Sequence, residues 1–315
     1  MRKLFLPLFL FALFALLLLS PERYFHSVQG GVLLFTSAVL PSMLPYFFFT
    51  KLLTGTGCVG ALSGTLGRPV RWAYRVAPIA SYPLLMSLLS GYPVGARVLG
   101  DLYDKGLISR EDARHAASFT STSGSMFVLG SVGAVILKDA GAGVVILVAH
   151  YLGAILNGFF YRGKADLHGQ SVLLAPSSVA TENLLSDAMY ESVLSLALVG
   201  GFIAIANLLG DMASDLLSHI FPTLFSGGTV WSGLLYGAFE VTRGCVEFSS
   251  LAASRAIKAA LCALAVSFGG LSVLFQSMSF LGKTGIKGGK FLLMKVTQSG
   301  VSFLLALALG FVFLQ

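Results

Sequence analysis

The sequence predicts an all-α, polytopic membrane protein. Of its 315 residues, 56% are hydrophobic and only 11% are charged, whereas a soluble domain carries about 25% charged residues. The mean hydropathy of +0.83 leads to the same class. Several apolar segments also approach or exceed the roughly 20 residues that a helix needs to cross a bilayer. These segments are 4–20, 32–53, 144–160, 193–209 and 291–314.

Charge and cysteine content exclude several other classes of protein. The formal net charge of +7 is the excess of Lys and Arg expected in cytoplasmic loops, so we expect the lipid bilayer and no nucleic acid as a partner. The cysteines, Cys58, Cys245 and Cys262, are scattered and odd in number, which favours neither a disulfide framework nor a metal site.

The N-terminal region, 1–53, is expected to form two transmembrane helices. Arg2 and Lys3 precede the first apolar core as in a secretory signal, but no small-x-small cleavage pattern follows it, so we expect a retained helix. With these two residues inside, the second helix returns to the cytoplasm. The stretch 51–75 holds four basic residues and no acidic one, which predicts a cytoplasmic loop.

The first repeat, 54–162, contains a break in its apolar run. Two apolar arms, 76–89 and 98–103, flank the segment Ser90–Arg97 (SGYPVGAR). Because each arm is shorter than a full span, they predict a re-entrant hairpin that enters and leaves on the cytoplasmic face. Such a break is tolerated only where protein or a wet cavity satisfies the backbone.

The long helix that follows is interrupted as well. Ser109 followed by Asp112 predicts its N-cap, and the helix is expected to run towards Leu137. Midway it meets six consecutive small polar residues, 120–125, whereas helix packing needs small residues only about every four positions. We therefore expect the helix to unwind there and to create a half-helix N-terminus that attracts anions.

A polar linker, 163–186, separates this half from a second repeat, 187–315. The loop 211–228 has no Lys or Arg, so we expect it outside the cell. Arg255 and Lys258 also fall outside in this topology, against the usual rule.

The second repeat follows the same plan. Its apolar run 230–239 leads to a break at 240–244 (EVTRG), and the next helix is interrupted within 267–276 (SFGGLSVLFQ). Paired interruptions in inverted halves are typical of transporters that bind substrate near the bilayer midplane. The sequence therefore predicts two inverted repeats, each with a re-entrant hairpin and an interrupted transmembrane helix.

The candidate substrate-binding residues come from these four breaks. Hydroxyl groups and exposed amides would contact the substrate, and Arg243 or Arg97 would bind a carboxylate. No organic cofactor or metal site is expected, although Na⁺ or H⁺ is a candidate coupling ion. The full set is Ser90, Gly91, Tyr92, Pro93, Arg97, Ser121, Thr122, Ser123, Gly124, Ser125, Glu240, Thr242, Arg243, Gly269, Gly270, Ser272 and Gln276.

Glu240 and Arg243 admit more than one interpretation. Ionisable residues at membrane depth are costly and usually functional, so Glu240 would bind a coupling cation or proton or orient Arg243. Residues three apart share a helical face, so a mutual ion pair is the alternative, and an ordinary loop position is the third. Arg97 has a similar local partner in Asp101.

No enzymatic signature is present. The segment 55–60 matches G-x-G-x-x-G, but no strand precedes it and no suitably placed acidic residue follows it, so we interpret it as a glycine-rich loop. The histidines lie far apart, and neither H-E-x-x-H nor G-x-S-x-G occurs. We therefore expect no enzyme activity and interpret His150 as a packed or interfacial residue.

Four elements occur in a characteristic order: SGYPVGAR with the following KGLISRED, then SGSMFVLGSVG, EVTRG and SFGGLSV. Together they resemble the YlbJ family of sporulation integral membrane proteins, over most of the chain from about residue 40 onwards. The sequence departs from the family pattern at Thr120, Ser121 and Thr122, where members commonly carry Asn and a Gly-Pro pair.

The resemblance implies a gate-domain, or nucleoside-recognition, fold that is distantly similar to concentrative nucleoside transporters. It also implies a role in spore formation, with dipicolinic acid moved across the outer forespore membrane. We therefore expect a transporter or facilitator of a small organic anion. A non-transporting protein for spore envelope assembly and a nucleoside transporter are the alternatives, and the sequence leaves a homo-oligomer open.

Overall fold

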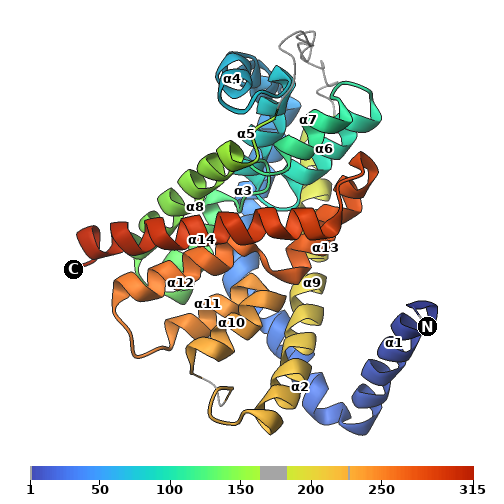
Figure 1. The fold of residues 1–315 in the computed structure, drawn as a ribbon, viewed down its shortest axis with the longest axis vertical. Coiled ribbons are helices and arrows are strands. Elements are labelled where there is room, and N and C mark those ends of the chain that lie inside the picture. The colour runs from blue at the N-terminus through green and yellow to red at the C-terminus, as the bar shows by residue number, and fades with distance from the viewer. Residues whose placement is uncertain (1, 164–182, 226–227) are drawn as a thin grey trace.

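The computed structural model describes residues 2–163, 183–225 and 228–315. These residues form helices and no strand (Figure 1). In chain order the elements are α1 (Arg2–Leu19), α2 (Pro21–Leu34), the π-helix η1 (Phe35–Val39), α3 (Leu40–Gly55), α4 (Cys58–Tyr74), the 3₁₀-helix η2 (Pro78–Ala80), α5 (Ser81–Ser90), α6 (Val94–Asp104), α7 (Arg110–Ala116), the π-helix η3 (Phe127–Ile136), α8 (Ala140–Phe160), α9 (Leu184–Ile220), α10 (Val230–Phe239), α11 (Val241–Ser249), α12 (Arg255–Phe268), α13 (Gly270–Leu281), the 3₁₀-helix η5 (Gly282–Thr284) and α14 (Gly288–Phe313).

Five helical segments within the described residues are long and apolar enough to cross a membrane. This confirms the expected all-α polytopic fold, whereas the inverted relation of the two halves stays a prediction. The expected segment 4–20 forms α1, which is a shorter apolar helix. The five spans are Pro21–Gly55, Ala140–Phe160, Leu184–Ile220, Arg255–Thr284 and Gly288–Phe313.

Two long helical segments frame one side of the molecule. Helices α2 and α3 are continuous through η1 and pack along α9. The two segments run antiparallel, because Lys51 pairs with Glu191 at one end and Arg23 pairs with Asp215 at the other. Figure 1 shows α4 at the top of the view, whereas α2 begins and α9 ends at the bottom.

Both helical hairpins form where the sequence predicts a break. Helices α5 and α6 pack against each other on either side of residues 91–93, and α10 and α11 do so on either side of Glu240. These four helices have 9 to 11 residues each. They are too short for a full span, which needs about 20 residues.

The two expected interruptions are also present, and each contacts the hairpin tip of its own repeat. Residues 120–124 are non-helical between α7 and η3, and α12 ends at Gly269, which is in the left-handed conformation. A side chain at Gly91 would overlap the backbone of Gly124, and a Cβ at Gly270 would lie 2.7 Å from the Phe239 carbonyl oxygen. Glycine at these two positions therefore lets the tip approach the interruption.

Two segments expected to be loops are helical. The stretch 51–75 contains α4, and α9 continues through 211–228 as far as Ile220. Helix α4 buries Val70 and Tyr74 but leaves Trp72 77% exposed. Charge distribution alone predicts a side of the membrane, which stays a prediction, and it could not distinguish a loop from an amphipathic helix.

The structure places part of the expected linker and Arg255, a basic residue expected outside the cell. Most of the expected linker 163–186 lies outside the described residues, and α9 begins within it at Leu184. Arg255 forms a bidentate pair with Asp139, with N–O distances of 2.7 and 2.9 Å. The carboxylate of Asp139 therefore neutralises the positive charge of Arg255 at the start of α12.

Candidate functional site

The hairpin tips and interruptions converge on a small cavity of about 50 Å³. A single water occupies about 10–15 Å³ by this measure, so the cavity has room for a few waters or an ion and is too small for an organic substrate. Its polar wall consists of residues predicted from the sequence to bind substrate. They are Tyr92, Ser123, Gly124, Glu240, Thr242, Ser272 and Gln276.

A larger cavity of about 430 Å³ lies next to the small one, and Tyr92, Val199 and Gln276 line both. Aromatic rings from α3, α5, α9 and α13 form much of its wall. Arg97 also lines it and is exposed, and its side chain has no ion-pair or hydrogen-bond partner among the residues that the structure describes. This cavity has the size of a small-molecule site, for which roughly 300–1,000 Å³ is typical.

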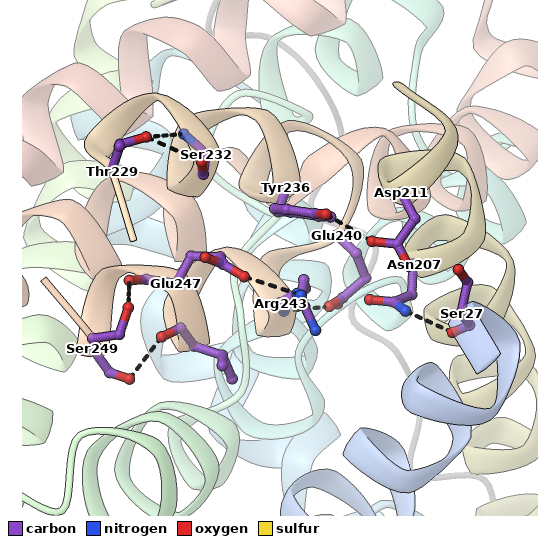
Figure 2. Close-up of polar contacts among 12 residues, drawn as sticks. Ser27, Asn207, Asp211, Thr229, Ser232, Tyr236, Glu240, Arg243, Glu247 and Ser249 are labelled. Carbon is purple, nitrogen blue, oxygen red and sulfur yellow. Dashed lines mark hydrogen bonds and ion pairs between the residues drawn. The ribbon is translucent and has the colours of Figure 1, made fainter. Parts of the chain in front are cut away.

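A third, polar cavity of about 530 Å³ lies towards the other end of α9. Figure 2 shows that Arg243 reaches this region from α11 and Asp211 from α9. The Arg243 guanidinium pairs with Glu247 at 3.1 Å and lies 4.7 Å from the centre of the Tyr236 ring. The Tyr236 hydroxyl donates a hydrogen bond of 2.7 Å to Asp211, and Asn207 donates one of 2.6 Å to the Ser27 carbonyl.

One row of residues on α9 passes all three cavities. The positions concerned are four residues apart, so they form a stripe that turns by about 40° at each step and winds around the helix. From the first to the last they extend about 30 Å at 1.5 Å per residue, which is close to the hydrocarbon thickness of a bilayer. The stripe consists of Glu191, Ser195, Val199, Ile203, Asn207 and Asp211.

Glu240 is buried at the second hairpin tip, with 4% of its surface exposed. Its carboxylate accepts a hydrogen bond from the Thr242 hydroxyl at 3.0 Å and one from the Arg243 backbone N–H at 2.9 Å. The carboxylate therefore caps the N-terminus of α11. The side-chain ion pair considered for Glu240 and Arg243 is not formed, because the guanidinium points to Glu247 instead.

The other predicted residues surround the cavities. Ser90 is buried at the first tip, and Pro93 lines the larger cavity beside Arg97. The Thr122 hydroxyl is hydrogen-bonded to Ser87, and the Ser125 hydroxyl to the Tyr46 hydroxyl at 2.8 Å. Thr122 and Ser125 therefore join neighbouring elements and do not line the small cavity. The buried Ser121 hydroxyl has no hydrogen-bond partner among the described residues.

Sequence reasoning missed a buried lysine on α14. Lys295 is 2% exposed, and its ammonium donates to the Tyr92 hydroxyl at 2.9 Å, the Ser121 carbonyl at 2.9 Å and the Gln298 side-chain oxygen at 2.8 Å. Within the described residues no carboxylate lies within ion-pair distance of it. The signal was available, since an ionisable residue inside an apolar span is usually functional.

His150 on α8 joins the interrupted helices of the two repeats. It is fully buried; its Nε2 accepts a hydrogen bond from the Ser123 backbone N–H at 2.8 Å, and its Nδ1 lies 2.7 Å from the Ser267 hydroxyl. Of the two interpretations of His150, the packed one agrees with this burial, but no sequence signal indicates that its contacts are the two interruptions.

Comparison with known proteins identifies the family. No protein-family model and no solved structure matches the chain. The sporulation integral membrane protein YlbJ of Bacillus subtilis is 30% identical to this chain over an alignment of 319 residues, gaps included. The alignment covers 92% of this chain and 78% of that protein. The resemblance noted in the sequence is thereby confirmed, and this chain belongs to the YlbJ family of sporulation integral membrane proteins.

Proposed function

We propose that this protein carries a small organic anion across the membrane of a spore-forming bacterium. The observation that supports this most strongly is the stripe on α9, whose residues line in turn a cavity near Lys51, the small cavity between the hairpin tips and a cavity near Arg243. A non-transporting scaffold has no need of cavities aligned across the thickness of a bilayer.

The small cavity is the constriction on this path. Its two sides are formed by the first tip and interruption, including Tyr92 and Ser123, and by the second tip and interruption, including Glu240 and Ser272. In transporters built from repeats, one part rocks against the other around a fixed site. We infer that such a movement widens this cavity and admits substrate from the larger one.

Fixed positive charge favours an anion on this path. Arg97 lines the larger cavity together with the carboxylates of Asp101 and Glu191 but forms an ion pair with neither, so its guanidinium is open to an anion. Lys295 lies directly behind Tyr92 without a carboxylate in contact among the described residues. Helix α13 also begins beside the small cavity, at Gly270, and helix N-termini attract anionic groups.

Dipicolinate suits the larger cavity. One of its carboxylates would meet the Arg97 guanidinium, and its aromatic ring would lie among Phe202, Phe275 and Phe280. Glu240 is the acidic group on the small cavity, so it is the candidate to carry a coupling proton.

The proposal is tested by uptake into proteoliposomes. Labelled dipicolinate, a non-aromatic dicarboxylate and a nucleoside are offered separately, with and without imposed Na⁺ and H⁺ gradients, and protein-free liposomes serve as the control. We expect protein-dependent uptake of dipicolinate and little of the nucleoside. Nucleoside uptake would favour the nucleoside alternative. Folded protein that moves none of the three would favour the role in spore envelope assembly.

A further inference from the structure

Lys295 has the environment of a bound cation. Its three acceptors come from three different elements: the Tyr92 hydroxyl from the first hairpin tip, the Ser121 carbonyl from the first interruption, and Gln298 from its own helix α14. The ammonium also lies 4.7 Å from the centre of the Tyr92 ring, close enough for a cation–π contact.

These acceptors are oxygen ligands of the type that bind a free alkali cation. Hard cations bind oxygen ligands, and carbonyls released by unwound transmembrane helices coordinate Na⁺ in transporters with this kind of break. The Ser121 carbonyl is released in this way, because residues 120–124 are non-helical. The ammonium of Lys295 occupies the position beside this carbonyl where a free cation would bind.

We propose that Lys295 is a tethered cation that takes the place of a coupling cation such as Na⁺ at the first interruption. The inference rests on the proposed transport function for its significance. The ammonium holds the tip at Tyr92 and the interruption at Ser121 together without an exchangeable ion. It also leaves a positive charge behind the wall of the small cavity, where it favours an anionic substrate.

The test measures stability alone, so it remains informative even if the transport assay fails. Purified parent protein and the Lys295→Ala variant are melted in NaCl, ethylammonium chloride or choline chloride at equal ionic strength. Shortening the side chain leaves the three acceptors around a vacant volume. We expect a lower melting temperature for the variant in choline, with partial recovery in Na⁺ or ethylammonium and a smaller cation response in the parent.

Lys258→Ala is the matched control. Lys258 also donates to a backbone carbonyl, that of Ser249 at 2.8 Å, but lies away from the interruption. Its variant should show no cation-dependent recovery. A Lys295→Ala variant whose response to Na⁺ and ethylammonium equals that of the parent and of this control would overturn the proposal.

If Lys295→Ala does not accumulate as folded protein, Lys295→Arg and Lys295→Met decide the question. Arginine keeps a tethered cation with hydrogen-bond donors, whereas methionine has similar length and no charge. The proposal predicts more folded protein with arginine. Equal or better folding of the methionine variant would show that a cation is not required at this position.

Discussion

Glu240 and Arg243 are connected through the backbone and not through their side chains. The carboxylate of Glu240 accepts the Arg243 N–H at 2.9 Å, and the guanidinium pairs with Glu247 at 3.1 Å. Glu240 therefore faces the small cavity while Arg243 faces the polar cavity at the other end of the path. Two charged residues that are three apart in the sequence therefore line two different cavities.

This arrangement predicts which pair of charges is energetically coupled. In double-mutant cycles built from glutamine substitutions, Glu240 and Arg243 should be additive, because each side chain keeps its own partner. Arg243 and Glu247 should show a coupling of about 0.5 kcal/mol, as is typical of a partly exposed pair four residues apart. Melting in detergent provides the measurement, and strong coupling of the first pair would contradict the structure.

The contact between each hairpin tip and its interruption predicts a strict need for glycine. Gly91→Ala and Gly270→Ala should each lower stability by roughly 1–3 kcal/mol through backbone strain, with a further loss from the close contact. Gly201→Ala is the control, because this glycine lies within α9 with nothing near the added Cβ. Its variant should be unchanged or more stable by up to about 1 kcal/mol in thermal melting. A mild effect of both substitutions would exclude the tight packing of tip against interruption.

Ser123 and Ser125 should differ although they are two residues apart. Ser123 lines the small cavity, and its hydroxyl makes no hydrogen bond among the described residues, so Ser123→Ala should lower transport and leave stability unchanged. Ser125→Ala removes the hydrogen bond to Tyr46 and should lower stability by about 1 kcal/mol. Tyr46→Phe should reproduce the effect of Ser125→Ala. Measuring both uptake and the melting temperature of each variant distinguishes a loss of transport from a loss of stability.

The side of the membrane can be tested with a native cysteine. Cys58, at the start of α4, is exposed, whereas Cys245 and Cys262 are buried. We expect Cys58 to react with a maleimide only after the cells are permeabilised. A cysteine introduced at the exposed His219, in a Cys58→Ser background, should react in intact cells. Reaction of both from one side would rule out the proposed topology.

Local sequence signals located the four breaks correctly. Apolar runs are interrupted by glycines at Gly91 and Gly270 and by polar residues around Ser123. Such an interruption is visible in the local sequence, because it does not depend on tertiary contacts. The same signals could not show that Arg243 faces a different cavity from Glu240, because that depends on how the capped helix α11 is oriented.

Lys295 and His150 could not be assigned contacts from the sequence. Each is a single polar residue within a long apolar helix, and its partners lie far away in the chain: Lys295 bonds Tyr92 and Ser121, and His150 bonds Ser123. Helical periodicity predicts neighbours three or four residues away and contains no information about these tertiary contacts.

A bulky side chain on α9 should obstruct the proposed substrate path. Val199 lines both the small and the larger cavity, whereas Ile205 lies on the same helix and is 54% exposed. Dipicolinate uptake is measured in proteoliposomes containing parent protein, Val199→Trp or Ile205→Trp at equal amounts of folded protein. We expect Val199→Trp to abolish uptake and Ile205→Trp to retain the parent rate. Parent-like uptake by Val199→Trp would rule out a substrate path along α9.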